Sequence, residues 1–294
     1  MFFTVGGTQT NATVIKFLLS PCEGVIAVSS AHINVHESGA IEATGHKVLT
    51  LPGHDGLLEP ETLRKYLADF YADPTYDHMV QPGMVYLSYS SELGTLYTKA
   101  MLSEIKAVCE EYGLKLFIDG ARLGAGLTSE KADMTIEDIA GLCDVFYIGG
   151  TKTGALFGEA VVFPEPERFD LRNFRTLIKQ QGGLLAKGRL LGIQFEVLFE
   201  DGLYFENARH SNIQAEKIKQ AFIQKGISFL IDSPTNQQFP ILTHEQDSAL
   251  REKFSYELWQ TMPGGKLAVR FCTSWATTDE AVDELVKAIA DLQH

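Results

Sequence analysis

Short apolar runs alternate with amphipathic segments through the first half of the chain. The apolar runs predict buried strands at residues 25–29, 47–51, 84–89, 115–118, 145–148 and 160–163. Between them, residues 59–71 and 99–112 carry apolar side chains at spacings of three and four, as a helix packed on a sheet requires. Strands that alternate with helices in this way predict an α/β domain with a large, mainly parallel sheet.

The pattern changes after Pro164. It is helical up to about Gly226, and strands predicted at residues 227–231, 239–242 and 267–272 then combine with two helices in a small α+β unit. We therefore expect a large domain over residues 1–204 and a small C-terminal domain over residues 205–294. The residues before Gly6 resemble the end of a strand, so we also expect an N-terminal segment that is short for a doubly wound enzyme.

Composition and charge narrow the functional classes. The 294 residues are 45% hydrophobic and 21% charged, which is typical of a globular protein, and the net charge of -13 disfavours nucleic acid and anionic lipid as partners. No apolar run reaches membrane-spanning length and the start lacks a signal-peptide pattern, which predicts a cytoplasmic protein. No metal site is expected, because the cysteines lie far apart and are typical of reduced core thiols: Cys22, Cys109, Cys143 and Cys272.

A glycine turn precedes the first amphipathic run. Gly6, Gly7 and Thr8 lead into a segment that extends to Leu19, which places free backbone N–H groups at the start of a helix. Such a helix start binds anions, so the turn is a candidate phosphate site. The alternative is an ordinary glycine turn in which Thr8 caps the helix.

Two strand ends carry candidate chemistry. Asp119 closes an apolar strand and Arg122 follows three residues later, near the sheet edge where ligands bind in α/β proteins. Lys152 follows another buried strand among glycines and small residues, where burial would favour the neutral, nucleophilic amine. The alternatives are a carboxylate that caps a helix or turn and a lysine in an exposed turn.

His32 lies just after a third strand end and could stack on a flat heterocycle. The alternative is a histidine that caps a helix or is partly buried. Four other histidines are interpreted as structural: His36, His46, His54 and His78. Together, the glycine turn, His32, Asp119 and Lys152 match the needs of one cofactor. Pyridoxal phosphate needs donors for its phosphate, a ring partner, a carboxylate at its pyridine nitrogen and an amine at its aldehyde.

The same segments resemble the L-threonine aldolase and aromatic β-eliminating lyase group of fold-type-I pyridoxal-phosphate enzymes, over nearly the whole chain. In that family a Gly-Gly-Thr-x-x-Asn loop holds the phosphate, which implies this role for Gly7, Thr8 and Asn11. An Ala-His-Ile turn with a following glutamate supplies the stacking ring, which here is His32 with Glu37.

The resemblance also implies roles for the strand-end residues. The family's Asp-Gly-Ala-Arg segment implies that Asp119 pairs with the pyridine nitrogen and that Arg122 holds the substrate carboxylate. Lys152 matches the lysine that holds the cofactor as a Schiff base, with Thr151 in place of serine. Arg270 resembles a second arginine for the carboxylate, and the alternative is a structural salt bridge with an aspartate or glutamate.

One loop bears on assembly. Residues 181–189 resemble a loop that reaches the phosphate of a neighbouring subunit, so Lys187 or Arg189 would have this role in a homodimer or homotetramer. Ordinary solvated cations at the start of a helix are the alternative interpretation.

The chain departs from the family pattern at residues 88–94. A second active-site histidine is absent there, so Ser91 or Glu92 is expected to contact the hydroxyl of the substrate. The implied activity is cleavage of a β-hydroxy amino acid, of the L-threonine or allo-threonine type, to glycine and an aldehyde, with His32 as the best candidate base. Another pyridoxal-phosphate reaction on an amino acid, such as β-elimination or racemisation, and a non-catalytic protein of this fold are the alternatives.

Overall fold

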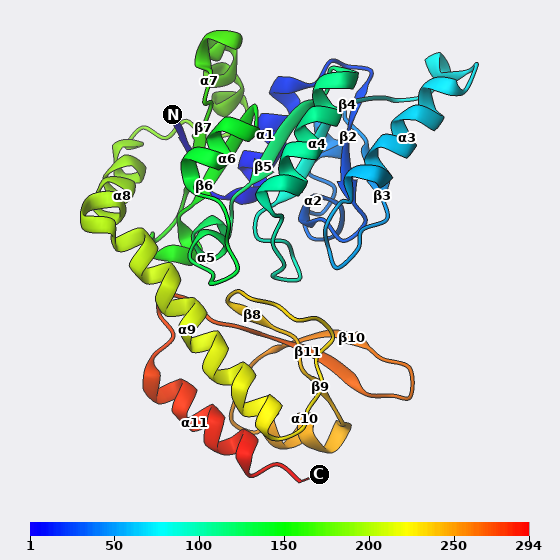
Figure 1. Ribbon diagram of the computed structural model, residues 1–294. Helices are drawn as coiled ribbons and strands as arrows, with labels where there is room; N and C mark the ends of the chain where they lie inside the picture. The colour runs from blue at the N-terminus through cyan, green and yellow to red at the C-terminus, as the bar shows by residue number, and fades with distance from the viewer. Residues whose placement is uncertain (294) are drawn as a thin grey trace.

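A computed structural model describes residues 1–293 and contains a large and a small sheet (Figure 1). The large sheet has the strand order β1-β7-β6-β5-β4-β2-β3, and β7 runs antiparallel to both of its neighbours. The strands from β2 to β6 are all parallel, so the predicted mainly parallel sheet is confirmed. The strands of this sheet are β1 (Phe2–Thr4), β2 (Glu23–Val28), β3 (Val48–Leu51), β4 (Gln81–Ser88), β5 (Lys115–Asp119), β6 (Val145–Gly149) and β7 (Glu159–Val162).

Helices cover both faces of the large sheet, as buried parallel strands require (Figure 1). On one face α3 packs against α4, and α4 against α6, while α1 packs against α7 on the other. One continuous apolar core joins both layers to the sheet. The helices of this large part are α1 (Gly7–Leu18), α2 (His32–Val35), α3 (Pro60–Ala72), α4 (Lys99–Tyr112), α5 (Leu123–Leu127), α6 (Ile136–Leu142), α7 (Leu171–Gln180) and α8 (Arg189–Phe199).

The C-terminal part has its own sheet and apolar core. In this sheet β11 (Leu267–Cys272) pairs with β8 (Gln237–Gln238), β9 (Ile241–Leu242) and β10 (Glu257–Thr261). The long helix α9 (Leu203–Gln224) runs from the large part into the small one, where it packs against α11 (Asp279–Ala290) (Figure 1). The boundary predicted at residue 204 falls in the first turn of α9, and it stays a prediction.

One strand predicted in the small part is absent, and the strand predicted at residues 239–242 is confirmed only over Ile241–Leu242. Residues 227–231 form no strand, and only Phe229 makes an isolated bridge, to Pro240. The segment that faces residues 227–231 is divided into the two-residue strands β8 and β9. Both pair with β11, so residues 227–231 have no continuous strand to pair with. Strand β10 was not predicted, because its side chains are largely exposed and carry no apolar alternation.

The prediction that all four cysteines are core thiols is half wrong. Cys109 and Cys143 are buried, but Cys22 and Cys272 are exposed. Apolar neighbours in the sequence misled this prediction, because side chains alternate between the two faces of a strand and Cys272 ends β11. No helix within residues 1–293 has the length and apolarity to cross a membrane.

The order and direction of the strands bring several strand ends and one helix start to the same edge of the large sheet. The parallel strands β2, β4, β5 and β6 all end there. Because β7 is antiparallel, its first residue, Glu159, lies at the same edge, opposite both Gly149 and Thr4. Helix α1 starts three residues after Thr4, so its N-terminus also lies at this edge.

Gly149 tests how tightly this edge is packed. A Cβ atom there would lie 2.5 Å from the carbonyl oxygen of Ala121 and 2.7 Å from that of Gly120. We expect Gly149→Ala to lower the free energy of unfolding by about 3 kcal/mol or more, because rigid backbone would have to move. Gly141 in α6 has open space around it, so the control Gly141→Ala should gain up to about 1 kcal/mol of helix propensity. Urea unfolding of both variants measures this, and equal stabilities would contradict it.

Candidate active site

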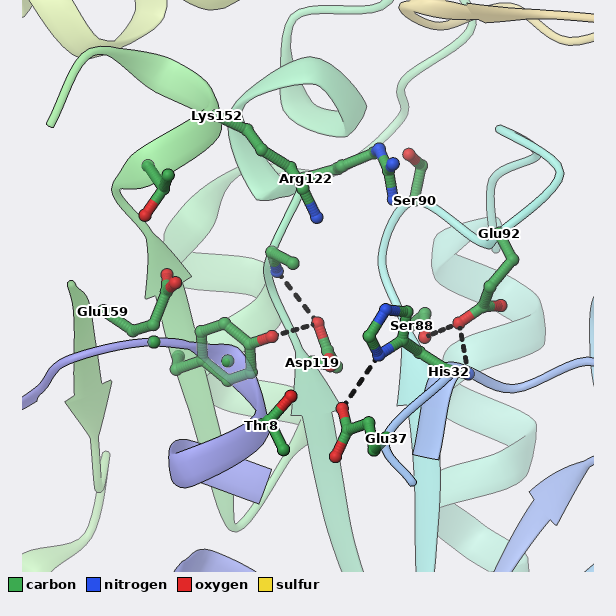
Figure 2. A pocket seen from close by; sticks show the side chains of 15 residues that line it. Thr8, His32, Glu37, Ser88, Ser90, Glu92, Asp119, Arg122, Lys152 and Glu159 are labelled. Carbon is green, nitrogen blue, oxygen red and sulfur yellow. Dashed lines mark hydrogen bonds and ion pairs between the residues drawn. The ribbon is translucent and has the colours of Figure 1, made fainter. Parts of the chain in front are cut away.

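A cavity of about 260 Å³ opens at this edge of the large sheet (Figure 2). Its walls come from segments that are far apart in the chain: the start of α1, α2, the loop after β4, the end of β5 and the turn after β6. Several of the residues predicted from the sequence line it: Gly7, Thr8, His32, Glu92, Asp119, Arg122 and Lys152.

Asp119 is the most extensively hydrogen-bonded of these side chains. Its Oδ1 accepts hydrogen bonds from the Tyr147 hydroxyl at 2.5 Å and the Ala121 amide at 2.9 Å. Its Oδ2 accepts from the Tyr86 hydroxyl at 2.5 Å and from Asn11 Nδ2 at 3.0 Å. These four donors fix the orientation of a carboxylate that is only 4% exposed and stabilise its negative charge.

The two tyrosines act as permanent donors to Asp119. Burial raises the pKa of both Tyr86 and Tyr147 well above the usual value, and the nearby Asp119 charge raises it further. Both hydroxyls therefore keep their protons at physiological pH.

The start of α1 offers the second feature of the cavity, an anion site. The helix begins after Gly6 with no side-chain cap, so its first N–H groups have no partner inside the helix. The alternative in which Thr8 caps the helix is therefore not what the structure contains. A Cβ atom on Gly7 would lie 3.1 Å from the Tyr147 hydroxyl, which places this uncapped start beside the Asp119 cluster.

Lys152 lies across the cavity from these groups, in the short 3-10 turn Thr151–Thr153 after β6 (Figure 2). Burial lowers the pKa of its amine to about 8, and the positive charge of Arg122 contributes in the same direction. Asp119 and Glu159 oppose this shift only in part. About a tenth of the amine is therefore neutral and nucleophilic at pH 7, far more than for an ordinary lysine.

His32 lies on the opposite wall, at the start of α2. Its Nδ1 is 2.8 Å from Oε1 of the buried Glu37, which also accepts from Asn11. A neutral ring that donates from Nδ1 to Glu37 has Nε2 free as an acceptor. The side chain is 41% exposed, so one part of the ring remains accessible.

The loop after β4 supplies a buried carboxyl group. Oε1 of Glu92 accepts from the Ser88 hydroxyl at 2.6 Å and from the His32 amide at 3.0 Å, while its Oε2 has no partner within residues 1–293. Burial raises the pKa of Glu92. Ser91, the other predicted residue here, is not among the lining residues, because its hydroxyl bonds Thr95 instead.

Other predicted residues lie outside the cavity. Asn11 stands behind it and bridges Glu37 and Asp119. Arg270 forms an ion pair with Glu257 and donates to Oε1 of Gln237 at 3.1 Å. Lys187 and Arg189 lie before and at the start of α8, away from the lining residues of this cavity.

Sequence reasoning missed several residues of the site. Tyr86 and Tyr147 were counted only as apolar strand residues, and nothing in their local pattern indicates a shared carboxylate partner. Glu159 opens β7 and is 5% exposed, and its carboxyl group accepts from the Gly150 amide at 3.0 Å. A charged residue at the head of an apolar strand was the only available signal for it.

Comparison with known proteins agrees with this site. Residues 1–244 match the beta-eliminating lyase family. A low specificity L-threonine aldolase from a Pseudomonas species is 32% identical, over 98% of this chain and 82% of the relative. The corresponding enzyme of Saccharomyces cerevisiae is 22% identical over 98% of this chain and 72% of its own length.

Solved structures give the same result. The threonine aldolase of Leishmania major superposes with a TM-score of 0.93 and is 45% identical, over 98% of this chain and 82% of that one. A serine palmitoyltransferase from Sphingomonas wittichii has a TM-score of 0.70 at 17% identity, over 98% of this chain and 70% of that one, and therefore shares the fold alone. The predicted fold type is confirmed, and the chain belongs to the threonine aldolase and beta-eliminating lyase family.

Proposed function

We propose that this protein is a pyridoxal-phosphate-dependent aldehyde-lyase that cleaves a β-hydroxy amino acid such as L-threonine to glycine and an aldehyde, in the cytoplasm. The observation that carries the proposal is the placement of Asp119, Lys152 and the uncapped start of α1 around one cavity. The family of the chain and the names of its relatives supply the reaction class.

The residues present fit this cofactor. The free N–H groups at the start of α1, with Gly7 and Thr8, would hold its phosphate, and Asp119 would face its pyridine nitrogen. Lys152 would bind its aldehyde and His32 would cover its ring. Bound there, pyridoxal phosphate supplies an aldehyde for amines and a ring that accepts the electron pair of a broken bond at the α-carbon.

The substrate hydroxyl has two candidate partners. Cleavage between the α- and β-carbons requires removal of the hydroxyl proton. His32 can accept it at Nε2, because Glu37 holds Nδ1 and would stabilise the positive charge that results. Glu92 Oε2 is buried and has no partner in the described part of the chain, so a hydrogen bond with the substrate hydroxyl would satisfy it and help to orient the scissile bond.

The substrate carboxylate would bind Arg122 first. Arg122 lines the cavity, and its Nε is buried without a partner among the described residues 1–293, so a carboxylate would supply an acceptor. The second proposed contact is Arg270, whose Nε is also buried and unpartnered within residues 1–293. Arg270 would then share its guanidinium between the substrate and Glu257.

We also propose that the protein forms a homodimer. Large apolar side chains are exposed along the loop before α8 and along α8 itself. Two of those on α8 line a groove of about 420 Å³ together with the exposed Leu156 and Trp275. A monomer rarely leaves so many in one region. The exposed apolar residues on this stretch are Leu184, Leu185, Leu190, Ile193, Val197 and Phe199. Lys187 and Arg189 lie in the same stretch, which suits the predicted contact with the partner's phosphate.

The reaction itself is tested by product analysis. Purified protein with pyridoxal phosphate and L-threonine should release glycine and acetaldehyde in equal amounts. Lys152→Ala should abolish this turnover, and Asp119→Ala should retain some cofactor yet lose turnover by about two orders of magnitude or more, because the ring nitrogen loses its charged partner. Release of a keto acid and ammonia instead would favour β-elimination, and formation of D-allo-threonine without glycine would favour racemisation, because only the α-carbon is inverted.

The role of Arg270 is tested against the ion pair. If Arg270 binds substrate, Arg270→Lys should raise the Michaelis constant for L-threonine about tenfold, because the planar fork is lost. Glu257→Gln is the matched control, since it breaks the ion pair and keeps the guanidinium. Normal kinetics in both variants, with lower melting temperatures, would make Arg270 purely structural.

The proposed dimer is tested by sedimentation. Val197→Glu places a charge on the exposed face of α8 and should yield monomers, because a buried unpaired charge destabilises an interface. Ile223→Glu is the control, because Ile223 is equally exposed at the far end of α9. A wild-type monomer, or a Val197→Glu protein that remains a dimer, would contradict the proposed interface.

A further inference from the structure

Glu159 has no role in the function proposed so far. It is the first residue of β7 and lines the cavity together with Thr8 and Lys152 (Figure 2). Its backbone pairs with Thr4, three residues before the start of α1. Glu159 therefore stands beside the N-terminus that forms the anion site.

The contacts of Glu159 favour an uncharged carboxyl group. Its Oε2 accepts a hydrogen bond from the Gly150 amide, which also donates to the Gly158 carbonyl at 3.2 Å. Within residues 1–293 no arginine, lysine or histidine forms an ion pair with it. A buried carboxylate with one shared donor and no cation is costly, and the neutral acid avoids that cost.

The charges around Glu159 act in both directions. Burial and, to a smaller extent, the Asp119 charge raise the pKa of its carboxyl group, whereas the hydrogen bond from the Gly150 amide and the Lys152 charge lower it, and the net pKa is about 8. Tyr147 on β6 and Tyr204 on α9 also face it and remain neutral, because burial raises the pKa of both. The amides at the start of α1 carry only partial positive charge.

We propose that Glu159 binds the phosphate of the cofactor as a neutral acid, donating its O–H to a phosphate oxygen beside the start of α1. The inference rests on the proposed function for the identity of the anion. A carboxylate in this position would repel the phosphate strongly in a buried site, whereas the acid adds a hydrogen bond. When Glu159 is already ionised, binding of the anion takes up one proton from solvent.

The affinity for the anion should decrease above pH 8. A bound dianion disfavours the carboxylate, so it raises the pKa of Glu159 above its value of about 8 in the free protein. Anion affinity is then fully present below pH 8 and falls as the pH rises above it. The decline is about tenfold per pH unit until the pKa of the bound state is passed.

The experiment is phosphorus NMR of the holoenzyme between pH 6.5 and 10. In the wild-type protein, the resonance of the bound cofactor should move with a midpoint above pH 8. It should stay flat in Glu159→Gln, which keeps a neutral donor of the same shape. Glu165→Gln is the matched control, because this exposed glutamate lies just after β7. The phosphorus resonance of this variant should move with pH as it does in the wild type.

A second measurement does not depend on a Glu159 variant. Sulfate is a dianion without a proton of its own in this range, and calorimetry of the cofactor-free Lys152→Ala chain in two buffers counts the protons taken up. At pH 8.5 sulfate binding should take up a substantial fraction of one proton. The Lys152→Ala background removes the other group of the cavity whose pKa lies near 8.

Each negative result has a distinct meaning. The same titration in Glu159→Gln as in the wild type, or sulfate binding without proton uptake, would overturn the role of Glu159 and leave the proposed function intact. Absence of any bound phosphorus signal, together with no sulfate binding, would overturn both.

Discussion

The hydrogen bonds to Asp119 are the interaction on which the site depends. They tie together four segments, because the donors are Asn11 on α1, Tyr86 on β4, Tyr147 on β6 and the Ala121 amide just after β5. A buried carboxylate without such donors would be too costly to keep. The same bonds set the start of α1 beside the sheet edge, so the anion site and the carboxylate keep a fixed relation to each other.

The cavity holds more acidic than basic groups. Glu37, Glu92, Asp119 and Glu159 line it, against Arg122 and Lys152 and the titratable His32. The four carboxyl groups are stabilised in different ways. Asp119 is stabilised by four donors, Glu37 by His32 and Asn11, and burial favours the protonated forms of Glu92 and Glu159. A protonated Glu159, as proposed above, would therefore lessen the repulsion that this acidic pocket exerts on an anionic ligand.

Much of the site could be predicted from the sequence, because parallel strands direct their carboxyl ends to one edge. Asp119 ends such a strand, Lys152 and His32 each follow one, and all three line the cavity. The direction of a particular side chain was harder to predict from the sequence. Ser91 turns to Thr95, and Arg270 bonds Glu257 and Gln237, since neighbours from other segments compete for the same polar atoms.

The sequence by itself determined the α/β architecture, the candidate lysine and aspartate and the glycine turn, because these depend on local periodicity and on residues whose backbone needs are local. Only the tertiary structure decided the partners of Asp119, the place of Glu159 and the exposure of Cys22 and Cys272. Glu159 reaches the cavity because β7 runs antiparallel between β1 and β6, a pairing between distant segments. Strand order of this kind follows from the packing of the whole chain, which no local pattern of residues encodes.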